Sequence, residues 1–229
     1  QSAWPSWRLL VPDPHVDAPR SMASPPRVLL TDRAWPDCEV ERQILSSIGA
    51  EVIDAPDPSE AALAALARDA DAIATCWAQV TPAVIEAATR CRVVARFGIG
   101  LDNIAIDTAT SRGIPVTYVP DYCVPEVSDH ALALLLAVNR KVAFFHHQTK
   151  QGHYELGAGP PLKRLNQLQL GLIGFGRIGR ALFSKATALG LRLVAHTPSG
   201  HDYGTGCPMV TLETLLHDSD FVSLHLPLN

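Results

Sequence analysis

Residues 170–180, which read LGLIGFGRIGR, decide the fold of this 229-residue chain. The glycines of this stretch have the spacing G-x-G-x-x-G and follow an apolar run, Leu170–Ile173, that is typical of a buried strand. A helical segment, Arg177–Leu189, comes next, and Arg192–His196 is predicted as a second strand. The spacing alone is weak evidence, but between a strand and a helix of a βαβ unit it indicates a dinucleotide-binding turn.

Each glycine of this turn has a separate physical role. Gly174 permits the tight turn, Gly176 lets a pyrophosphate approach the backbone, and Gly179 lets the helix pack closely on the strand. The N-terminus of the helix adds free N–H groups and the positive end of its dipole. We predict these three glycines as cofactor-binding residues, and a glycine-rich turn without a ligand is the competing explanation.

The residue that is expected to bind the adenosine ribose lies at the end of the second strand, about 20 residues after the turn. Thr197 occupies this position. A carboxylate here would bind the ribose 2′-hydroxyl and repel a 2′-phosphate, and a threonine does neither strongly. Asp202 follows closely and would oppose a 2′-phosphate, so we predict NAD as the cofactor, with Thr197 as a cofactor-binding residue, and NADP stays open as the alternative.

Upstream of this unit, residues 27–119 alternate short apolar strands with helices. Strands are predicted at Arg27–Thr31, Glu51–Ile53, Ala72–Cys76, Val93–Phe97 and Val116–Val119. Short apolar strands separated by helices indicate a parallel sheet that is covered on both faces, so we predict an α/β fold with doubly wound sheets. Residues 1–26, which hold six of the eighteen prolines, are predicted to form a disordered tail.

Residues 120–229 are predicted to form a second domain. It begins with a long helix whose apolar run, Ala131–Val138, is expected to be buried. After the dinucleotide turn and its βαβ unit, a strand is predicted at Phe221–His225 and a further one at Met209–Thr211. A complete dinucleotide-binding sheet has about six strands. We therefore expect this domain to be truncated and the chain to be a fragment.

Composition argues against several classes of function. The net charge of −4 is spread along the chain, which argues against nucleic acid or a membrane surface as a partner. The longest apolar run is far shorter than the ~20 residues of a membrane span. Five cysteines without a CxxC pair argue against a disulfide scaffold and favour the cytoplasm. His146, His147 and His153 lack a further ligand at zinc spacing, so no metal site is predicted.

Four stretches of the chain together resemble one known family, the D-isomer-specific 2-hydroxyacid dehydrogenases. They are ARFGIGLDNI (95–104), RGIPV (112–116), LGLIGFGRIGR (170–180) and SDFVSLHLPL (219–228). The family includes phosphoglycerate dehydrogenases, glyoxylate/hydroxypyruvate reductases and the C-terminal-binding-protein corepressors. The resemblance implies a flavodoxin-like substrate domain followed by a Rossmann domain, in a homodimer. It also implies hydride transfer between a nicotinamide cofactor and C2 of a small D-2-hydroxy or 2-oxo acid.

The resemblance assigns roles to individual positions. The loop of Gly98, Ile99 and Gly100 matches the segment whose backbone N–H groups bind the substrate carboxylate. Without the resemblance, this loop would be an ordinary strand-to-helix turn. The further cofactor-contacting positions that the resemblance implies are Ile99, Val127, Arg177, Ile178, Leu226 and Pro227.

The family's catalytic arginine, glutamate and histidine match positions beyond Asn229, so the resemblance places no catalytic residue in this chain. We expect the 229-residue chain itself to be inactive. His225 is expected to line the cofactor, and Asp102 and Asn103 are predicted to cap the helix that begins at Ile104. Two other functions stay open, an NAD(H)-sensing binding protein in the manner of the corepressors and a truncated product without function.

Overall fold

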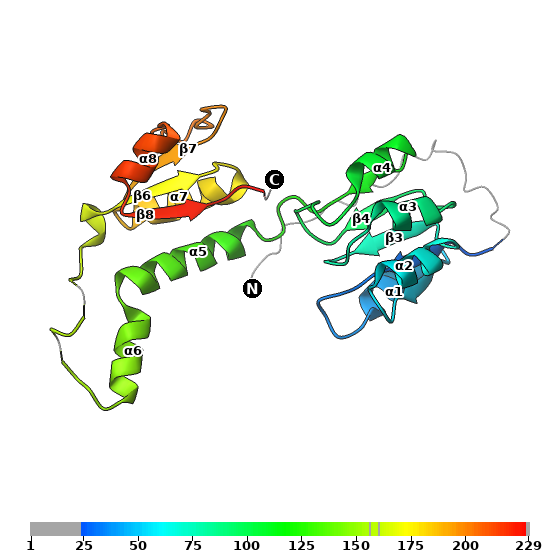
Figure 1. Ribbon diagram of the computed structural model, residues 1–229, viewed down its shortest axis with the longest axis horizontal. Coiled ribbons are helices and arrows are strands. Elements are labelled where there is room, and N and C mark those ends of the chain that lie inside the picture. Colours follow the sequence, from blue (N-terminus) through cyan, green and yellow to red (C-terminus); the bar gives the residue numbers. More distant parts are fainter. Residues whose placement is uncertain (1–23, 156, 160, 228–229) are drawn as a thin grey trace. The chain divides into compact units, whose positions relative to one another are not determined.

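The computed structural model describes residues 24–155, 157–159 and 161–227. The chain divides into two compact units, one that ends at Val119 and one that begins at Pro120, and each is described by itself (Figure 1). The predicted proline-rich tail, residues 1–26, falls almost wholly outside the described residues. Within the described ranges, no helix is long and apolar enough to cross a membrane.

The first unit alternates strands and helices along its described length. Its strands are β1 (Arg27–Leu30), β2 (Glu51–Asp54), β3 (Ala72–Thr75), β4 (Val94–Arg96) and β5 (Val116–Thr117). Its helices are α1 (Glu39–Ser46), α2 (Glu60–Ala67), α3 (Pro82–Ala87) and α4 (Ile106–Ser111). Neighbouring strands pair in parallel, in the order β2-β1-β3-β4-β5. This is the order of flavodoxin-like sheets, and it confirms the predicted doubly wound α/β class.

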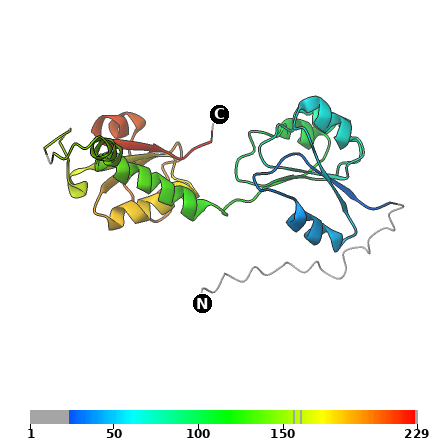
Figure 2. The same ribbon diagram turned by 90° about the horizontal axis from the view of Figure 1, so that it is seen from below.

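Alternating residues of this sheet face two different layers of helices. Leu29 and Ile73 are fully buried in a core that includes residues of α2, α3 and α4, whereas Leu30 and Ala74 pack with Cys38 at the start of α1. Figure 2 shows the same division, with α1 (blue) on one side of the sheet and the later helices on the other. The strands are apolar on both faces because both faces are covered, and each fully buried leucine or isoleucine contributes about 1.5–3 kcal/mol.

The second unit begins with two helices and continues into a three-stranded sheet. Its helices are α5 (Val124–Asn139), α6 (Val142–Lys150), the 3₁₀ turn η1 (Leu165–Gln167), α7 (Arg177–Ala188) and α8 (Leu212–Asp218). Its strands are β6 (Gln169–Ile173), β7 (Arg192–His196) and β8 (Phe221–Leu224), all parallel in the order β7-β6-β8. Leu170 and Leu172 of the sheet and Leu182 of α7 share one core. This is the βαβ arrangement predicted from the dinucleotide turn.

The predicted strand at Met209–Thr211 is not formed. The segment Met209–Thr211 makes a single bridge, from Met209 to Ala195, instead of a strand. Thr211 is already the N-cap of α8, where its hydroxyl accepts the N–H of Thr214, so the chain leaves the sheet edge at once. In addition, α6 follows α5 after a break at Lys141, which has a left-handed φ of 55°. No glycine or proline marks this break in the sequence, and these are the usual signals of a helix end.

α5 is partly exposed, which corrects the expectation that its apolar run is buried. Leu135 packs into the core with α7 and the sheet, but Leu134 and Val138 are each 55% exposed. A helix that is apolar on several sides has more apolar surface than one neighbouring layer can cover. The start of α5 is fixed to α7, because Nζ of Lys185 donates to the hydroxyl of Ser128 at 2.7 Å.

Candidate functional site

The turn after β6 is held between the ends of its two neighbouring strands. Gly174 has a φ of +91°, a left-handed conformation that glycine adopts without strain. Its N–H donates to the carbonyl oxygen of His196, at the end of β7, at 3.0 Å. A side chain on Gly174 would collide with the carbonyl oxygen of His225, just after β8. The fold itself therefore requires glycine here, where the three strands end.

Gly179 and Gly176 differ in what surrounds them. A Cβ on Gly179 would lie 2.5 Å from the carbonyl oxygen of Gly174, so the close approach of α7 to the turn depends on this glycine. A Cβ on Gly176 would meet nothing within 4 Å. The fold therefore does not need glycine at position 176, and the space beside it is open to a ligand.

The N-terminus of α7 supplies donors for an anion. The N–H groups of Gly176, Arg177 and Ile178 find no hydrogen-bond acceptor among the described residues, and no side chain caps the helix. Because α7 has 12 residues, its dipole adds positive potential at this end. Open space beside Gly176 and free donors next to it form a cradle that suits a pyrophosphate. The residues present therefore fit the group predicted from the sequence.

Thr197 follows β7 and opens a tight turn. Its hydroxyl accepts a hydrogen bond from the N–H of Gly200 at 3.2 Å and lies 3.2 Å from the hydroxyl of Ser199. A hydroxyl that already bonds within its own turn has little left to offer a ribose. The ribose-binding role of Thr197 stays a prediction, and the turn geometry makes its contribution small.

The acidic side chain of the loop after this turn forms hydrogen bonds within the loop itself. The carboxylate of Asp202 accepts the N–H groups of Gly204 and Gly206, each at 3.1 Å. These hydrogen bonds hold the pKa of Asp202 below its usual value. The carboxylate therefore shapes the loop as an ionised group.

Arg180 is a further candidate site residue, and the sequence pattern does not predict it. Its guanidinium lies over the ring of Tyr203, 4.2 Å from the centroid, and also donates to the carbonyl oxygen of Phe175 at 3.1 Å. Tyr203 has a left-handed φ of 54°, which is uncommon for an aromatic residue and marks a constrained loop. Arg180 thus ties the loop after β7 to the glycine turn. The one signal in the sequence is its place directly after Gly179.

The segment after β8 borders a hollow that α5 lines. Val127 of α5 and His225 line the same hollow, of about 390 Å³. Burial lowers the pKa of His225, so the imidazole is neutral at neutral pH, and its Nε2 lies 2.9 Å from the hydroxyl of Ser223. Leu226 and Pro227 follow and are exposed. The structure brings Val127 to His225, and His225 to the glycine turn, but contact of Val127, Leu226 and Pro227 with a cofactor stays a prediction.

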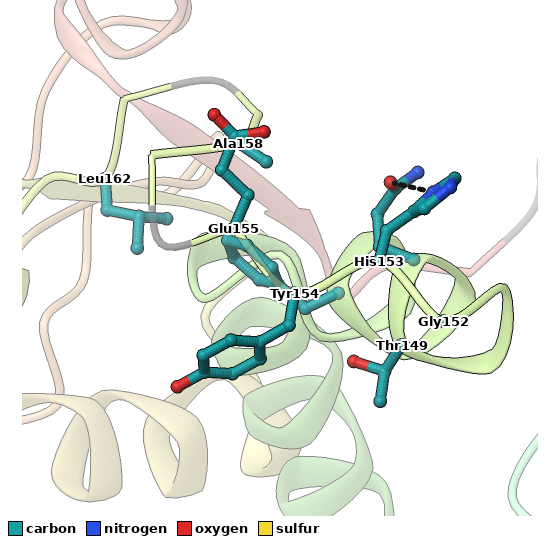
Figure 3. A pocket seen from close by; sticks show the side chains of 9 residues that line it. Thr149, Gly152, His153, Tyr154, Glu155, Ala158 and Leu162 are labelled. Atoms are coloured by element: carbon teal, nitrogen blue, oxygen red, sulfur yellow. Dashed lines mark hydrogen bonds between the residues drawn. The ribbon is translucent and has the colours of Figure 1, made fainter.

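A larger hollow, of about 830 Å³, lies between α6 and the loop that follows it (Figure 3). His153 faces Gln148 there at 3.3 Å, whereas the side chain of Tyr154 points away from both and is 85% exposed. None of the predicted cofactor or substrate residues lines this hollow. Across the described ranges, no three His, Cys, Asp or Glu side chains lie together as metal ligands would. We assign the larger hollow no role, because its polar groups do not converge on one point.

The loop after β4, in the first unit, also carries free donors. The N–H of Val119 donates to the carbonyl oxygen of Gly98 at 3.0 Å, which fixes the start of the loop. The N–H groups of Gly98, Ile99 and Gly100 find no acceptor in the part of the chain that the structure describes. Successive free N–H groups form anion-binding concavities. The carboxylate-binding role of this loop stays a prediction that its donors suit.

The predicted helix cap next to this loop is wrong. α4 begins at Ile106, and neither Asp102 nor Asn103 caps it. Asn103 is buried instead, where its amide nitrogen donates to the carbonyl oxygen of Ala78 at 2.9 Å and its amide oxygen accepts from Nε of Arg96 at 3.0 Å. An asparagine before a helix suits a cap or a buried bridge equally well in sequence, and only the fold decides between them.

Comparison with known proteins agrees with a dinucleotide-binding turn in the second unit. Residues 132–229 match the family described as D-isomer specific 2-hydroxyacid dehydrogenase, NAD binding domain. A hydroxypyruvate reductase from Thermotoga maritima is 39% identical over 150 residues, which cover 66% of this chain and 49% of that protein. The chain belongs to the D-isomer-specific 2-hydroxyacid dehydrogenase family. The resemblance drawn from the four sequence stretches is thereby confirmed.

Other members extend the comparison to the first unit. A glyoxylate reductase from Thermococcus litoralis is 35% identical over 186 residues, covering 76% of this chain and 56% of that protein. The structure of an NADPH-dependent glyoxylate/hydroxypyruvate reductase from Sinorhizobium meliloti, in complex with NADP and malonate, is 30% identical with a TM-score of 0.76. It covers 89% of this chain and 63% of that one.

The chain spans about half the length of the two reductases from Thermotoga maritima and Thermococcus litoralis. The match over residues 132–229 identifies the second unit as an NAD-binding domain of the family. The NADP in the Sinorhizobium meliloti structure keeps NADP open as the alternative cofactor.

Proposed function

We propose that this 2-hydroxyacid dehydrogenase family member is an oxidoreductase that transfers a hydride between NAD(H) and C2 of a small D-2-hydroxy or 2-oxo acid. The observation that carries the proposal is the turn after β6, where open space beside Gly176 adjoins the free N–H groups of Arg177 and Ile178. These groups would hold the pyrophosphate, with Thr197 at the ribose. A nicotinamide cofactor held by these residues would supply the hydride chemistry.

The substrate carboxylate is assigned to the loop of Gly98, Ile99 and Gly100, which the three free N–H groups support. We assign acid–base catalysis to none of the described residues. His225 lies next to the glycine turn, but burial lowers its pKa and keeps it neutral, and its Nε2 already faces the hydroxyl of Ser223. The 229-residue chain is therefore expected to bind NADH without turning over a substrate.

The protein is further proposed to be a cytoplasmic homodimer. The exposed apolar residues of α5, Leu134 and Val138, support association, because a surface of this kind is usually covered by a partner. The cysteines support a reducing compartment, since all five are free.

A chimaera tests the proposed activity. Residues 24–229 would replace the matching part of the Thermococcus litoralis glyoxylate reductase, to which this chain is 35% identical. We expect the chimaera to consume NADH when glyoxylate or hydroxypyruvate is added, measured as loss of NADH absorbance. The isolated 229-residue chain is the control and is expected to bind NADH only. A folded chimaera that binds NADH but reduces neither acid would contradict the proposed function.

Cofactor choice is expected to change when a carboxylate replaces Thr197. Thr197→Asp should raise the preference for NADH over NADPH about tenfold, because a charged hydrogen bond to the ribose contributes about 1 kcal/mol more than a neutral one and the carboxylate repels a 2′-phosphate. Thr197→Asn is the matched control, since it changes the shape in the same way without the charge. The measurement is the ratio of dissociation constants from NADH and NADPH fluorescence titrations. An unchanged ratio in Thr197→Asp would mean that another residue contacts the ribose.

A further inference from the structure

The carboxyl ends of β1, β3 and β4 surround the loop of residues 98–100, called the 98–100 loop below. Thr75 at the end of β3 pairs with Arg96 at the end of β4, so Trp77 and Gly98 each lie two residues beyond the ends of these neighbouring strands. The strand order places the reversal of the sheet between β1 and β3. Ligands of open α/β sheets bind at the carboxyl ends of strands near such a reversal. The 98–100 loop therefore lies where a ligand is expected on topological grounds.

A half-buried guanidinium lies against this loop. Nη1 of Arg96 is 2.7 Å from the position that a Cβ on Gly98 would occupy. Nε of Arg96 donates to the buried amide of Asn103, which the carbonyl oxygen of Ala78 holds in place. Arg96 makes no ion pair with any carboxylate of the described residues. This fixed cation and the free N–H groups beside it suit one carboxylate.

Two carboxylates limit the charge that the same place can accept. Asp32, after β1, accepts the N–H groups of Cys76 at 2.8 Å and Trp77 at 2.7 Å. Burial alone would raise the pKa of Asp32, but these and further hydrogen bonds together lower it, so the group is ionised at neutral pH. At the other end of the loop, Oδ1 of Asp102 is 2.7 Å from the position of a Cβ on Gly100. Among the described residues, a second negative charge on a ligand would therefore meet the carboxylates of Asp32 and Asp102 as well as the guanidinium of Arg96.

Aromatic side chains lie at the same strand ends. The ring of Trp35, from the segment after β1, meets the ring of Phe97 edge-on, with centroids 5.3 Å apart. Trp77 is 63% exposed, although its backbone is fixed through the hydrogen bond to Asp32. An exposed indole on a fixed backbone offers a large apolar surface at a small cost in side-chain entropy. Trp77 therefore offers an exposed apolar surface just after β3, beside the strand that leads into the 98–100 loop.

We infer that this site selects a 2-oxo or 2-hydroxy acid with a single negative charge and an apolar side chain, and that Trp77 contacts that side chain. Asp32 and Asp102 select against dicarboxylic and phosphorylated acids. The inference rests on the proposed function, because it takes the 98–100 loop as the site of the substrate carboxylate. It narrows that function to one class of acid within the range that the family handles.

The experiment measures binding of three 2-oxo acids to the 229-residue chain in saturating NADH, by isothermal titration calorimetry. The acids are 4-methyl-2-oxopentanoate, an apolar monoanion; glyoxylate, a monoanion without a side chain; and 2-oxoglutarate, a dianion. We expect 4-methyl-2-oxopentanoate to bind about tenfold more tightly than either of the others. Its branched side chain would be buried against Trp77, away from water, and it carries no second negative charge.

Variants distinguish a contact between Trp77 and the side chain of the acid from a general effect on acid binding. Trp77→Ala is expected to weaken binding of 4-methyl-2-oxopentanoate about tenfold and to leave glyoxylate unchanged, whereas Trp77→Phe keeps most of the preference. Tyr154→Ala is the matched control, since Tyr154 is an exposed aromatic residue of the second unit. If 2-oxoglutarate binds as tightly as 4-methyl-2-oxopentanoate, or if Trp77→Ala weakens all three acids equally, the inference is wrong while the proposed function stands. If NADH binds but none of the acids does, the substrate part of the proposed function fails as well.

Discussion

We expect the substitution Gly176→Val to weaken NADH binding about a hundredfold or more. The branched side chain would fill the open space where the pyrophosphate approaches the N-terminus of α7. Loss of two charge-assisted hydrogen bonds, at about 1.5–3 kcal/mol each, is enough for a change of this size. Valine is compatible with the backbone here, since Gly176 has φ −71° and ψ −159°. The measurement is a fluorescence titration of the purified chain with NADH.

Gly176→Ala is the control for this variant, because a single methyl group occupies the same space without the branch. We expect it to weaken NADH binding much less than Gly176→Val does. Both variants should unfold slightly below the parent and close to each other, because alanine and valine are poorer N-cap residues than glycine and a Cβ at this position meets nothing within 4 Å. NADH binding to Gly176→Val with the parent's affinity would show that the turn does not hold the pyrophosphate.

Gly174→Ala is expected to destabilise the second unit by about 3 kcal/mol. Two costs add, the left-handed φ of +91°, at about 1–2 kcal/mol for a residue with a Cβ, and the collision with the carbonyl oxygen of His225, at about 1–3 kcal/mol. Hydrogen exchange of the β6 and β8 amides measures the effect, because these amides report on the second unit alone.

Gly200→Ala separates the two costs of Gly174→Ala. Gly200 also has a left-handed φ, of +65°, but a Cβ there would meet nothing within 4 Å. We therefore expect Gly200→Ala to cost only the backbone strain, about 1–2 kcal/mol. Equal costs for the two variants would mean that the contact with His225 is not what requires glycine at position 174.

The elements that sequence predicts best are those that depend on local chemistry. β7 spans the predicted residues Arg192–His196, and the glycine turn lies between β6 and α7 as its spacing requires. Apolar runs, a turn residue and a helix start lie next to one another in the chain, so one short window contains all that is needed. The same is true of the alternating strands and helices of the first unit.

Features that depend on distant partners are missed or misjudged. Asn103 bridges to Ala78 and Arg96 instead of capping α4, and the ring of Tyr203 meets Arg180 across the turn of the second unit. Ala78 and Asn103 lie 25 residues apart, and Arg180 and Tyr203 are also far apart in the chain, so no short window of sequence contains both members of either pair. The exposure of Leu134 on α5 is missed for a related reason, because an apolar helix pattern does not tell how many neighbours will cover it.

The three glycines of the turn show what structure adds to a correct motif. Sequence assigns all three to one cofactor-binding pattern. The surroundings divide them, because Gly174 and Gly179 have backbone oxygens where a Cβ would be, and Gly176 has open space. Folding requires glycine at positions 174 and 179. At position 176 folding makes no such demand, so glycine there is explained by the binding of a ligand.

The contact between Gly174 and His225 also orders events during synthesis. The carbonyl oxygen that Gly174 must face belongs to a residue that follows β7 and α8, so it leaves the ribosome long after the glycine turn does. Contacts between residues far apart in the chain form late in folding, because the loop between them must close first. A nascent chain that has exposed only β6 and α7 therefore carries the glycine turn without the segment after β8 that packs against it. We therefore expect competence to bind the cofactor to arise only after β8 has docked beside the glycine turn.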